Sequence, residues 1–224
     1  MIALARFQLA GYVRSLRVLQ PLLVVLLILS LVLLQGPGGN ARLAAGTLGD
    51  AAAFMFPVWA WTARALLDTQ PDEQRSLTAL AVRPRAVAGL LAAYTANIGL
   101  GALVLAVPVV QALSAGSGAG VVLAGLGLTL LAALAATVLG AWTSRAIIPH
   151  GGVSLLALVG GVAAALLLSL GPLSWLAVPM VGWLRAAHDG PSALIGAFPG
   201  IALHLVLWSA AVGAAYLAAA RSRP

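Results

Sequence analysis

The chain has 224 residues, of which 62% are hydrophobic and only 8% are charged, and its formal net charge at pH 7 is +7. Soluble domains carry about 25% charged residues, so this composition excludes an ordinary water-soluble protein. The chain has no cysteine, which excludes disulfides, thiolate metal sites and cysteine nucleophiles, and it has no lysine, so arginine supplies the positive charge. We therefore expect an all-α polytopic membrane protein, organised as one transmembrane domain over residues 1–224.

The first 17 residues form a basic amphipathic segment. Arg6 and Arg17 fall in nearly the same direction on a helical wheel, with Arg14 close by, and the apolar residues lie mostly elsewhere. This pattern predicts a helix over 1–17 that lies in the membrane interface before the chain turns inward. The alternative is a positively charged flank that only sets the topology.

Six apolar runs are long enough to cross a bilayer, which takes about 20 residues. The first is too long for a signal-peptide core and is followed by no small-residue cleavage site, so we expect it to be retained. The predicted spans cover 18–34, 47–67, 86–113, 121–142, 153–170 and 201–217.

Acidic and aromatic residues indicate where the spans meet the membrane surfaces. A carboxylate at mid-bilayer is costly, so we place Asp50 towards the outer interface. Trp59 and Trp61 then fit the inner aromatic belt, and Trp142 and Tyr216 also fit belt positions.

Two features of the third and fourth spans concern helix packing. The segment from Ser114 to Gly120 predicts a tight, uncharged hairpin between these spans. In the fourth span, Ala132, Ala136 and Gly140 repeat every four residues, a pattern of small residues that lets helices approach closely.

Residues 171–200 are apolar, but prolines and glycines interrupt them. Interior prolines disrupt helices, so we do not expect a continuous span here. Two short helices that dip back into the membrane fit best, joined around His188, Asp189 and Gly190 and broken again by Pro199. We expect this re-entrant hairpin on the outer side, before the last span.

The arginines test the predicted topology. With both termini in the cytoplasm, only Arg42 and Arg185 lie outside, and ten arginines lie inside, as the positive-inside rule requires. The ten are Arg6, Arg14, Arg17, Arg64, Arg75, Arg83, Arg85, Arg145, Arg221 and Arg223.

The polar segment between the second and third spans reads as a short helix over 71–83. Pro71 suits the first helical position, where its missing N–H is no loss. Asp72 and Glu73 follow in the first turn, near the positive end of the helix dipole. Arg83 ends the helix, because Pro84 pushes the residue before it out of the α region. The arginine distribution places this helix on the cytoplasmic side.

Several chemistries find little support in the sequence. A Walker A loop is impossible without its lysine, so any ATP chemistry belongs to another chain. His150, His188 and His204 are too scattered for a metal site. Two alternatives stay open: an intramembrane serine-type enzyme that uses Ser117 or His204, and a small ATP-independent carrier.

The order of these features resembles the permease subunit of type-2 ATP-binding-cassette (ABC) exporters. In that family an interfacial helix precedes six spans, a short coupling helix joins spans two and three, and a broken hairpin lies outside between spans five and six. The resemblance covers the whole chain in layout and is closest in sequence over residues 63–94. There the chain carries the acidic start, the short helix, Pro84 and Arg85, but it lacks the glycine common in the family motif.

The resemblance implies a bacterial inner-membrane exporter subunit that is not itself an enzyme. Its implied partners are a separate ABC ATPase, which holds the ATP and magnesium, and a second permease, identical or related. We expect Leu77 and Leu80, one turn apart, to supply the apolar contacts of the coupling helix with that ATPase. The polar rim of this contact would be Asp72, Glu73, Arg75 and Arg83.

Polar and aromatic residues deep in the third and sixth spans are candidates for the translocation path. Such residues usually face protein or a cavity rather than lipid. The alternative is that they form hydrogen bonds between helices and contact no substrate. The candidates are Tyr94, Thr95, Asn97, His204 and Trp208.

Overall fold

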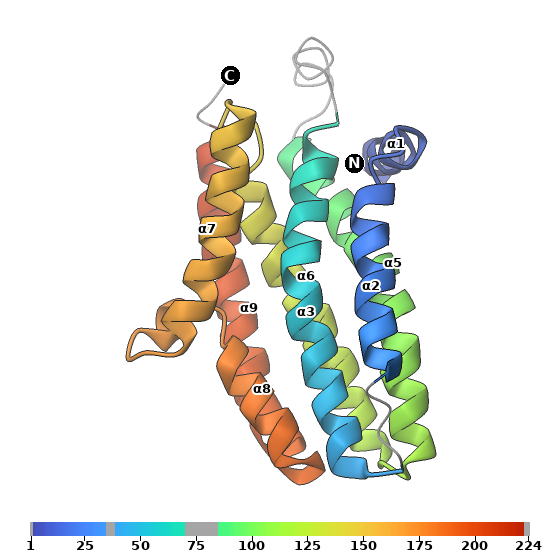
Figure 1. Ribbon diagram of the computed structural model, residues 1–224. Coiled ribbons are helices and arrows are strands. Elements are labelled where there is room, and N and C mark those ends of the chain that lie inside the picture. Colours follow the sequence, from blue (N-terminus) through green and yellow to red (C-terminus); the bar gives the residue numbers. More distant parts are fainter. Residues whose placement is uncertain (1, 35–38, 70–84, 222–224) are drawn as a thin grey trace.

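The computed structural model is a bundle of helices that run mostly side by side, with one helix crossing an end of the bundle (Figure 1). The structure describes residues 2–34, 39–69 and 85–221, and within these ranges all the regular elements are helices. The predicted all-α fold class is therefore confirmed.

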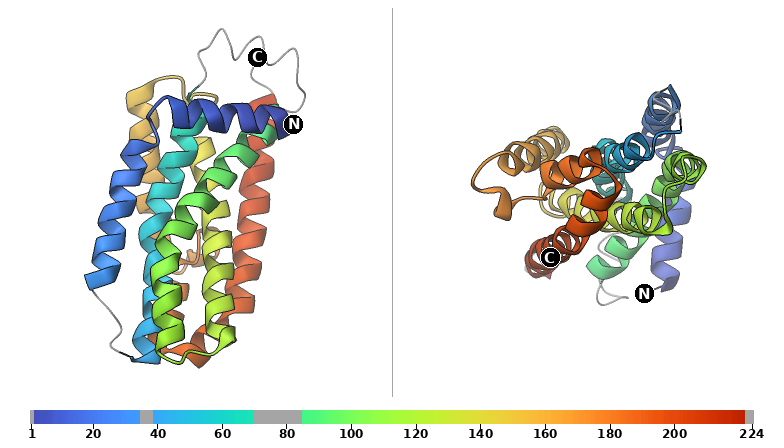
Figure 2. Two further views of the ribbon diagram at one scale, coloured as in Figure 1. Left: turned by 90° about the vertical axis from the view of Figure 1, so that its right-hand side faces the viewer. Right: turned by 90° about the horizontal axis from the view of Figure 1, so that it is seen from below.

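The N-terminal segment forms two helices at a sharp angle. Helix α1 (Ile2–Arg14) meets α2 (Leu19–Leu34) at 77°, and α1 lies across the end of the bundle (Figure 2). Tyr12, only 1% exposed, packs α1 against residues of α3 and α5. Leu16, between the helices, has a φ of 57°, a left-handed conformation that is rare for leucine and helps make the turn.

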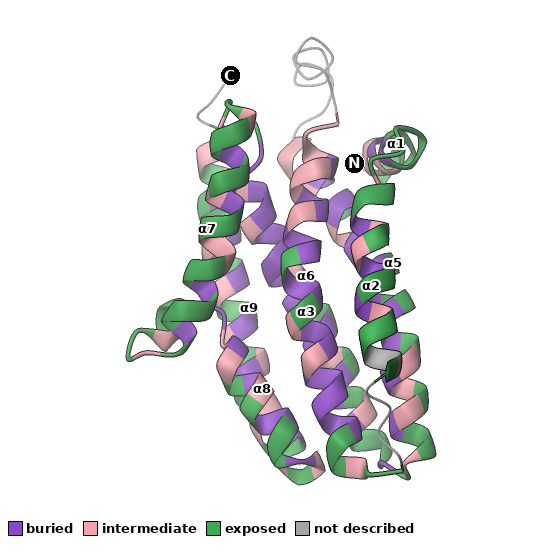
Figure 3. Cartoon of the chain, in the orientation of Figure 1, coloured by how far each residue is buried: buried purple, intermediate pink, exposed green. Residues whose placement is uncertain are grey.

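Helix α3 (Ala41–Leu67) is the centre of the bundle. It begins six residues before the predicted span, because the Asn40 side chain caps it by accepting hydrogen bonds from the backbone N–H groups of Arg42 and Leu43. Most of its residues are buried (Figure 3). Alanine and glycine dominate its first half, and these small residues allow the neighbouring helices to approach closely.

Helices α5 (Arg85–Ser114) and α6 (Ala119–Trp142) form the hairpin that the sequence predicts. Gly116 takes a φ of +72°, which glycine adopts without strain. The Ser117 N–H donates to the Ala112 carbonyl over 2.9 Å and closes the C-terminal turn of α5.

The small-residue pattern of α6 packs as expected. Ala132 and Ala136 are fully buried, and Gly140 lies directly against α3. A Cβ atom on Gly140 would stand 2.2 Å from the Ala60 carbonyl oxygen, so only glycine fits there. Because Gly140 has no side chain, α6 can pack directly against the backbone of α3 at Ala60.

The last third of the chain differs from its prediction. After α7 (Gly151–Ser169) come a 3₁₀ turn (Ser174–Leu176), the short helix α8 (Met180–Asp189) and the long helix α9 (Pro191–Arg221). The chain reverses at Gly190, whose φ is +116°, where the joint was expected. The break expected at Pro199 is a correction: Pro199 lies inside α9, and the predicted second short helix is the start of that helix.

In the part of the chain that the structure describes, five helices, α3, α5, α6, α7 and α9, are long and apolar enough to cross a membrane, and the bent pair of α1 and α2 brings the number to as many as six. These helices support a membrane-embedded, multi-pass protein. The exact layout of six spans stays a prediction.

Candidate functional site

The predicted coupling helix, residues 71–83, lies outside the described residues, and so do Asp72, Glu73, Arg75, Leu77, Leu80 and Arg83. The structure does describe the residues on either side of it. Helix α3 ends at Leu67 and α5 begins at Arg85, both at the end of the bundle that α1 crosses (Figures 1 and 2). The segment therefore leaves and re-enters the described fold at this end.

Seven of the nine described arginines belong to helices or turns at this same end, which we call the arginine-rich end. They are Arg6, Arg14, Arg17, Arg64, Arg85, Arg145 and Arg221. Arg42 starts α3 at the opposite end, and Arg185 lies in α8, which runs towards that end. The two groups match the predicted division of these residues, although the side of the membrane that each end faces stays a prediction.

A polar network fixes the end of α3 where the 70–84 segment leaves it. The Asp68 carboxylate accepts the backbone N–H of Arg145 at 2.8 Å, and the Asp68 carbonyl accepts the Arg17 side chain at 3.1 Å. Arg64 donates to the Ser154 hydroxyl at 2.5 Å and to the Gly151 carbonyl at 3.2 Å. These bonds connect α3 to the α1–α2 turn, to the turn after α6 and to the start of α7. They hold these four elements together at the arginine-rich end.

At the opposite end, α3 is joined to α8. His188 Nε2 lies 2.9 Å from an oxygen of Asp50, and Arg42 Nε donates to the His188 carbonyl at 2.8 Å. Next to these bonds the two helices are in close contact, because a Cβ atom added to Gly49 of α3 would lie 2.5 Å from the Ala187 methyl group of α8. Asp50 thus lies towards the end away from α1, as predicted. Its histidine partner was not predicted, because 138 residues separate the two in sequence.

Asn97, one of the predicted path residues, forms hydrogen bonds between helices. It is fully buried, and its side-chain nitrogen donates to the Trp59 carbonyl at 3.0 Å and to the Thr137 hydroxyl at 2.9 Å. Its side-chain oxygen is buried and has no hydrogen-bond partner among the described residues. Asn97 therefore joins α5 to both α3 and α6, as the hydrogen-bonding alternative predicts, and still leaves one polar atom unused.

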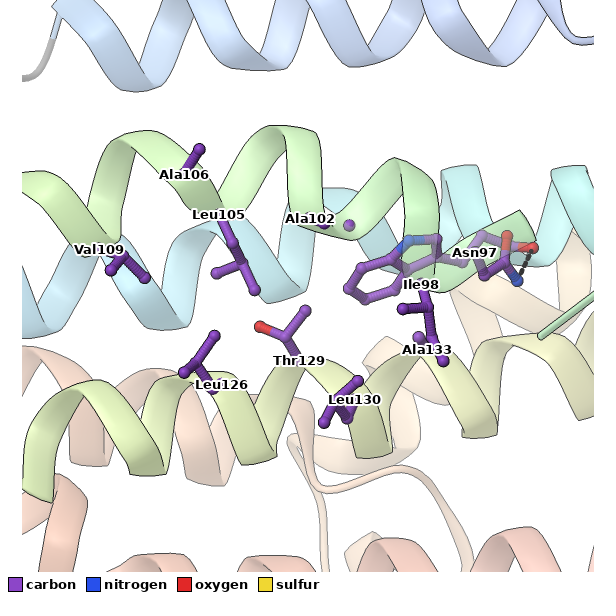
Figure 4. Close-up of a pocket in the computed structure, with 12 residues that line it drawn as sticks. Asn97, Ile98, Ala102, Leu105, Ala106, Val109, Leu126, Thr129, Leu130 and Ala133 are labelled. Carbon is purple, nitrogen blue, oxygen red and sulfur yellow. Dashed lines mark hydrogen bonds between the residues drawn. The ribbon is translucent and has the colours of Figure 1, made fainter. Parts of the chain in front are cut away.

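Asn97 also lines a cavity of about 370 Å³ between α5 and α6. Side chains from both helices face each other across it, with Leu105 of α5 pointing towards Thr129 of α6 (Figure 4). Trp59 of α3 and Gly101 also line this cavity, and the remaining lining residues are almost all apolar. On the outer surface of the bundle its edge is formed by exposed residues, among them Ile98 and Leu130.

His204 and Trp208 lie elsewhere. They line a second, wider cavity of about 510 Å³ between α9 and the 3₁₀ turn, together with Trp175 and Leu176. Trp208 Nε1 donates to the Leu176 carbonyl at 2.9 Å, and His204 Nε2 is buried without a partner in the described part of the chain. Three of the five candidate path residues therefore line a cavity, Asn97 in one and His204 and Trp208 in the other.

Tyr94 and Thr95, the other predicted path residues in α5, each donate a hydrogen bond to a backbone carbonyl. Tyr94 is partly buried and its hydroxyl donates to the Leu130 carbonyl at 3.2 Å. Thr95 is exposed on the outside of the bundle and donates to the Leu91 carbonyl of its own helix. Neither residue lines the two cavities described above.

The aromatic belt prediction needs correction at two positions. Trp59 is 0% exposed and lies in the core against Gly101, and Tyr216 is 2% exposed and packs edge-to-face with Trp142 at 6.3 Å. A tryptophan near the end of an apolar run fits both a belt and a core, so sequence position alone did not separate them.

Ser117, the serine of the enzyme alternative, lies in the loop between α5 and α6. Its hydroxyl is buried and has no hydrogen-bond partner among the described residues. His150, His188 and His204 lie in different elements, and the described residues contain no group of three potential metal ligands.

Comparison with known proteins gives no matching family model, no similar curated protein and no similar solved structure. The resemblance to ABC exporter permeases therefore stays a prediction from the sequence.

Proposed function

We propose that the chain is the membrane-spanning subunit of an ATP-driven exporter, and that it couples to a separate ATPase through residues 71–83. The observation that carries the proposal is the position of this segment. It joins the described fold at the arginine-rich end, where the positive-inside rule places the cytoplasm. An ATPase in the cytoplasm would meet the segment there.

The hydrogen bonds at the end of α3 would allow a movement of residues 71–83 to be transmitted to several helices. A partner that moves residues 71–83 would pull on α3 through Asp68 and on α5 through Arg85. Asp68 is held by the turn after α6 and by Arg17, so the motion would reach several helices together as a rigid-body shift. ATP and magnesium would be bound by the partner.

A second permease fits the outward faces of the last helices. In the most apolar 18-residue stretch of each helix, only 17% of α7 and 22% of α9 are buried within this chain. Both faces are rich in leucine and valine, so they suit either lipid or another helical subunit. In the proposed exporter the translocation path lies between two permeases, and the cavity with His204 and Trp208 would open towards it.

A pull-down from native membranes tests the proposal. The tagged wild-type protein, solubilised in mild detergent at low salt, should recover an ATPase that carries a P-loop. The double variant Leu77→Asp, Leu80→Asp should lose it, because two carboxylates would have to be buried in the apolar contact.

The matched control is Gly118→Asp, Ala119→Asp, which places the same charges at the exposed start of α6, at the end of the bundle away from residues 70–84. This control should keep the ATPase. Recovery of no ATPase with wild type, or equal recovery with both double variants, would contradict the proposed coupling.

A further inference from the structure

Helix α1 turns apolar side chains away from the bundle. Its inner side places Gln8 and Tyr12 against α5 and α3, where both residues are buried. Its outer side exposes large apolar residues: Ile2 is 70% exposed, Phe7 54% and Val13 52%. On a water-soluble protein the apolar side of a surface helix faces the core, so the outer side of α1 is built for an environment other than water.

Two arginines share this outer side. Arg6 and Arg14 are both exposed, and they lie one turn before and one turn after the exposed Ala10. The helical repeat places this stripe between Val13 on one side and Phe7 on the other. Neither arginine has a hydrogen-bond or ion-pair partner within the described residues. The outer face of α1 therefore combines free positive charge with exposed apolar side chains.

The sequence around α1 supplies no negative charge to balance these arginines. Residues 1–49 contain no aspartate or glutamate, and Asp50, the first acid, lies towards the opposite end of the bundle. Arg17, in the turn after α1, differs from the other two because it donates to the Asp68 carbonyl at 3.1 Å. The charge on the outer face of α1 is thus available to an external anion.

The position of α1 indicates what this anion belongs to. Helix α1 crosses the end of the bundle at 77° to α2 (Figure 2), so in a membrane-embedded protein it runs along the membrane surface. Leu23 and Leu27 of α2 are exposed, as expected for a helix that faces lipid. Leu16 and Leu19 are exposed at the turn and continue this apolar surface along the chain to α1. This continuity favours a lipid surface over an acidic protein as the partner of α1.

An anionic phospholipid matches the outer face of α1, because its phosphate accepts hydrogen bonds from a guanidinium and its acyl chains accommodate apolar side chains. We infer that this face is a docking surface for anionic phospholipids. Arg6 and Arg14 pair with the headgroups, and Phe7 and Val13 insert between the lipids. A zwitterionic lipid carries the same phosphate beside an ammonium group, so net charge is the basis of the selectivity.

The inference goes beyond an interfacial position for α1, because it specifies the class of lipid and the two residues that select it. It requires the chain to be embedded in a membrane and does not depend on an ATPase partner.

Fluorescence quenching by brominated lipids tests this surface on the full chain in nanodiscs. The chain has no cysteine, so Ala10→Cys provides a single site for a bimane label between the two arginines. Ordinary phosphatidylcholine is replaced stepwise by a lipid that carries bromine near the headgroup end of its acyl chains. This quencher is brominated phosphatidylglycerol in one titration and brominated phosphatidylcholine in the other, and the two titrations give the relative affinity of the lipids at α1.

Both lipids should quench the label, because α1 lies among them. The relative affinity should favour phosphatidylglycerol by about five- to twentyfold, since each arginine close to an anionic membrane contributes about fivefold. Addition of Arg6→Gln and Arg14→Gln to the labelled protein removes both charges and keeps the apolar residues. Quenching should then persist, while the preference for phosphatidylglycerol should fall to about one- to twofold.

The double variant Arg145→Gln, Arg221→Gln is the matched control. It removes the same charge from exposed positions at the same end of the bundle, one in the turn after α6 and one at the end of α9. Interactions between exposed charges are screened beyond about 8 Å at physiological salt. The control should therefore keep the preference within about twofold of that of the labelled protein.

Equal affinity of the two lipids for the labelled protein with both arginines intact would overturn the inference, and this arm needs no further variant. Quenching by neither lipid would show that α1 does not face lipid, would favour an acidic protein as its partner and would also overturn the inference. An equal loss of preference in the two double variants would do the same, because it would indicate a general attraction to the arginine-rich end. None of these outcomes depends on recovery of an ATPase, so the proposed function and this inference can fail separately.

Discussion

Asn97 shows how one polar residue can hold three helices together in an apolar bundle. Its amide bonds to the backbone of α3 and to a side chain of α6, from a position in the middle of α5. Inside a membrane no water is available to replace these hydrogen-bond partners, so the bonds specify which helices pack together and in which register.

Replacement of Asn97 by leucine should therefore lower the free energy of unfolding. Two hydrogen bonds would be lost, and the Trp59 carbonyl and the Thr137 hydroxyl would each lose a donor. The expected cost is about 1–2 kcal/mol. Thr95→Val is the control, since Thr95 is exposed and bonds only to its own helix. Denaturation of the two variants in mixed micelles measures the difference, and equal stability would contradict the role given to Asn97.

Gly140 carries the second prediction at this scale. In Gly140→Ala the new methyl group would overlap the Ala60 carbonyl, so the helices must separate, at a cost of about 1–3 kcal/mol. Gly160→Ala, in α7, meets nothing within 4 Å and should be neutral or slightly stabilising. Thermal unfolding of both purified variants checks this. A Gly140→Ala protein as stable as wild type would show that α3 and α6 are not in such close contact.

Single residues were predictable where one rule applied and not where two competed. The depth of Asn97 in an apolar run, and the four-residue spacing that ends at Gly140, both indicated buried positions. Trp59 satisfied the rule for membrane-surface aromatics equally well, and only the three-dimensional packing against Gly101 places it in the core. The cavity beside it depends on side chains from three helices, which no linear pattern reveals.

At the scale of elements, helix boundaries followed the sequence except at the start of α3, which the Asn40 cap sets six residues earlier, and at Pro199, where proline was given too much weight. Proline inside a helix removes one hydrogen bond, but its φ is compatible with the helix, and membrane helices tolerate it. Pro57, Pro108 and Pro199 all lie inside helices of this bundle. The reliable breaker was Gly190, because its positive φ is unfavourable for other residues.

The contact of α3 with α8 gives a prediction for a single element. Asp50→Ala removes the partner of His188 and should loosen the last turn of α8. His188 is exposed, so the effect should be small, about two- to fivefold faster amide hydrogen exchange in residues 185–189.

Asp189→Ala is the control for this experiment, because it removes a neighbouring exposed acid from α8 itself. Exchange in the same residues should then stay within error of wild type. If both variants accelerate exchange equally, the effect comes from the loss of negative charge near the helix end and not from the pairing of Asp50 with His188.

At the scale of the whole molecule, the positive charge is distributed unevenly between the two ends of the bundle. Seven of the nine described arginines lie at the end crossed by α1, and the segment proposed to contact an ATPase joins the fold there. The charge pattern predicted this grouping, because loop arginines are counted without knowledge of the packing. The path of a substrate through the bundle was not predictable in this way, because it depends on which faces of several helices meet.

The most direct test is therefore to find which end of the molecule faces the cytoplasm. The chain has no cysteine, so single cysteines can be introduced and labelled with a membrane-impermeant maleimide in intact cells. Gly118→Cys and Ser192→Cys mark the end away from α1, and Pro149→Cys and Gly152→Cys mark the arginine-rich end; all four positions are exposed. We expect the first pair to be labelled in intact cells and the second pair only after the membrane is permeabilised. The reverse pattern would place residues 71–83 outside the cell, beyond the reach of any cytoplasmic ATPase, and would contradict the proposed function.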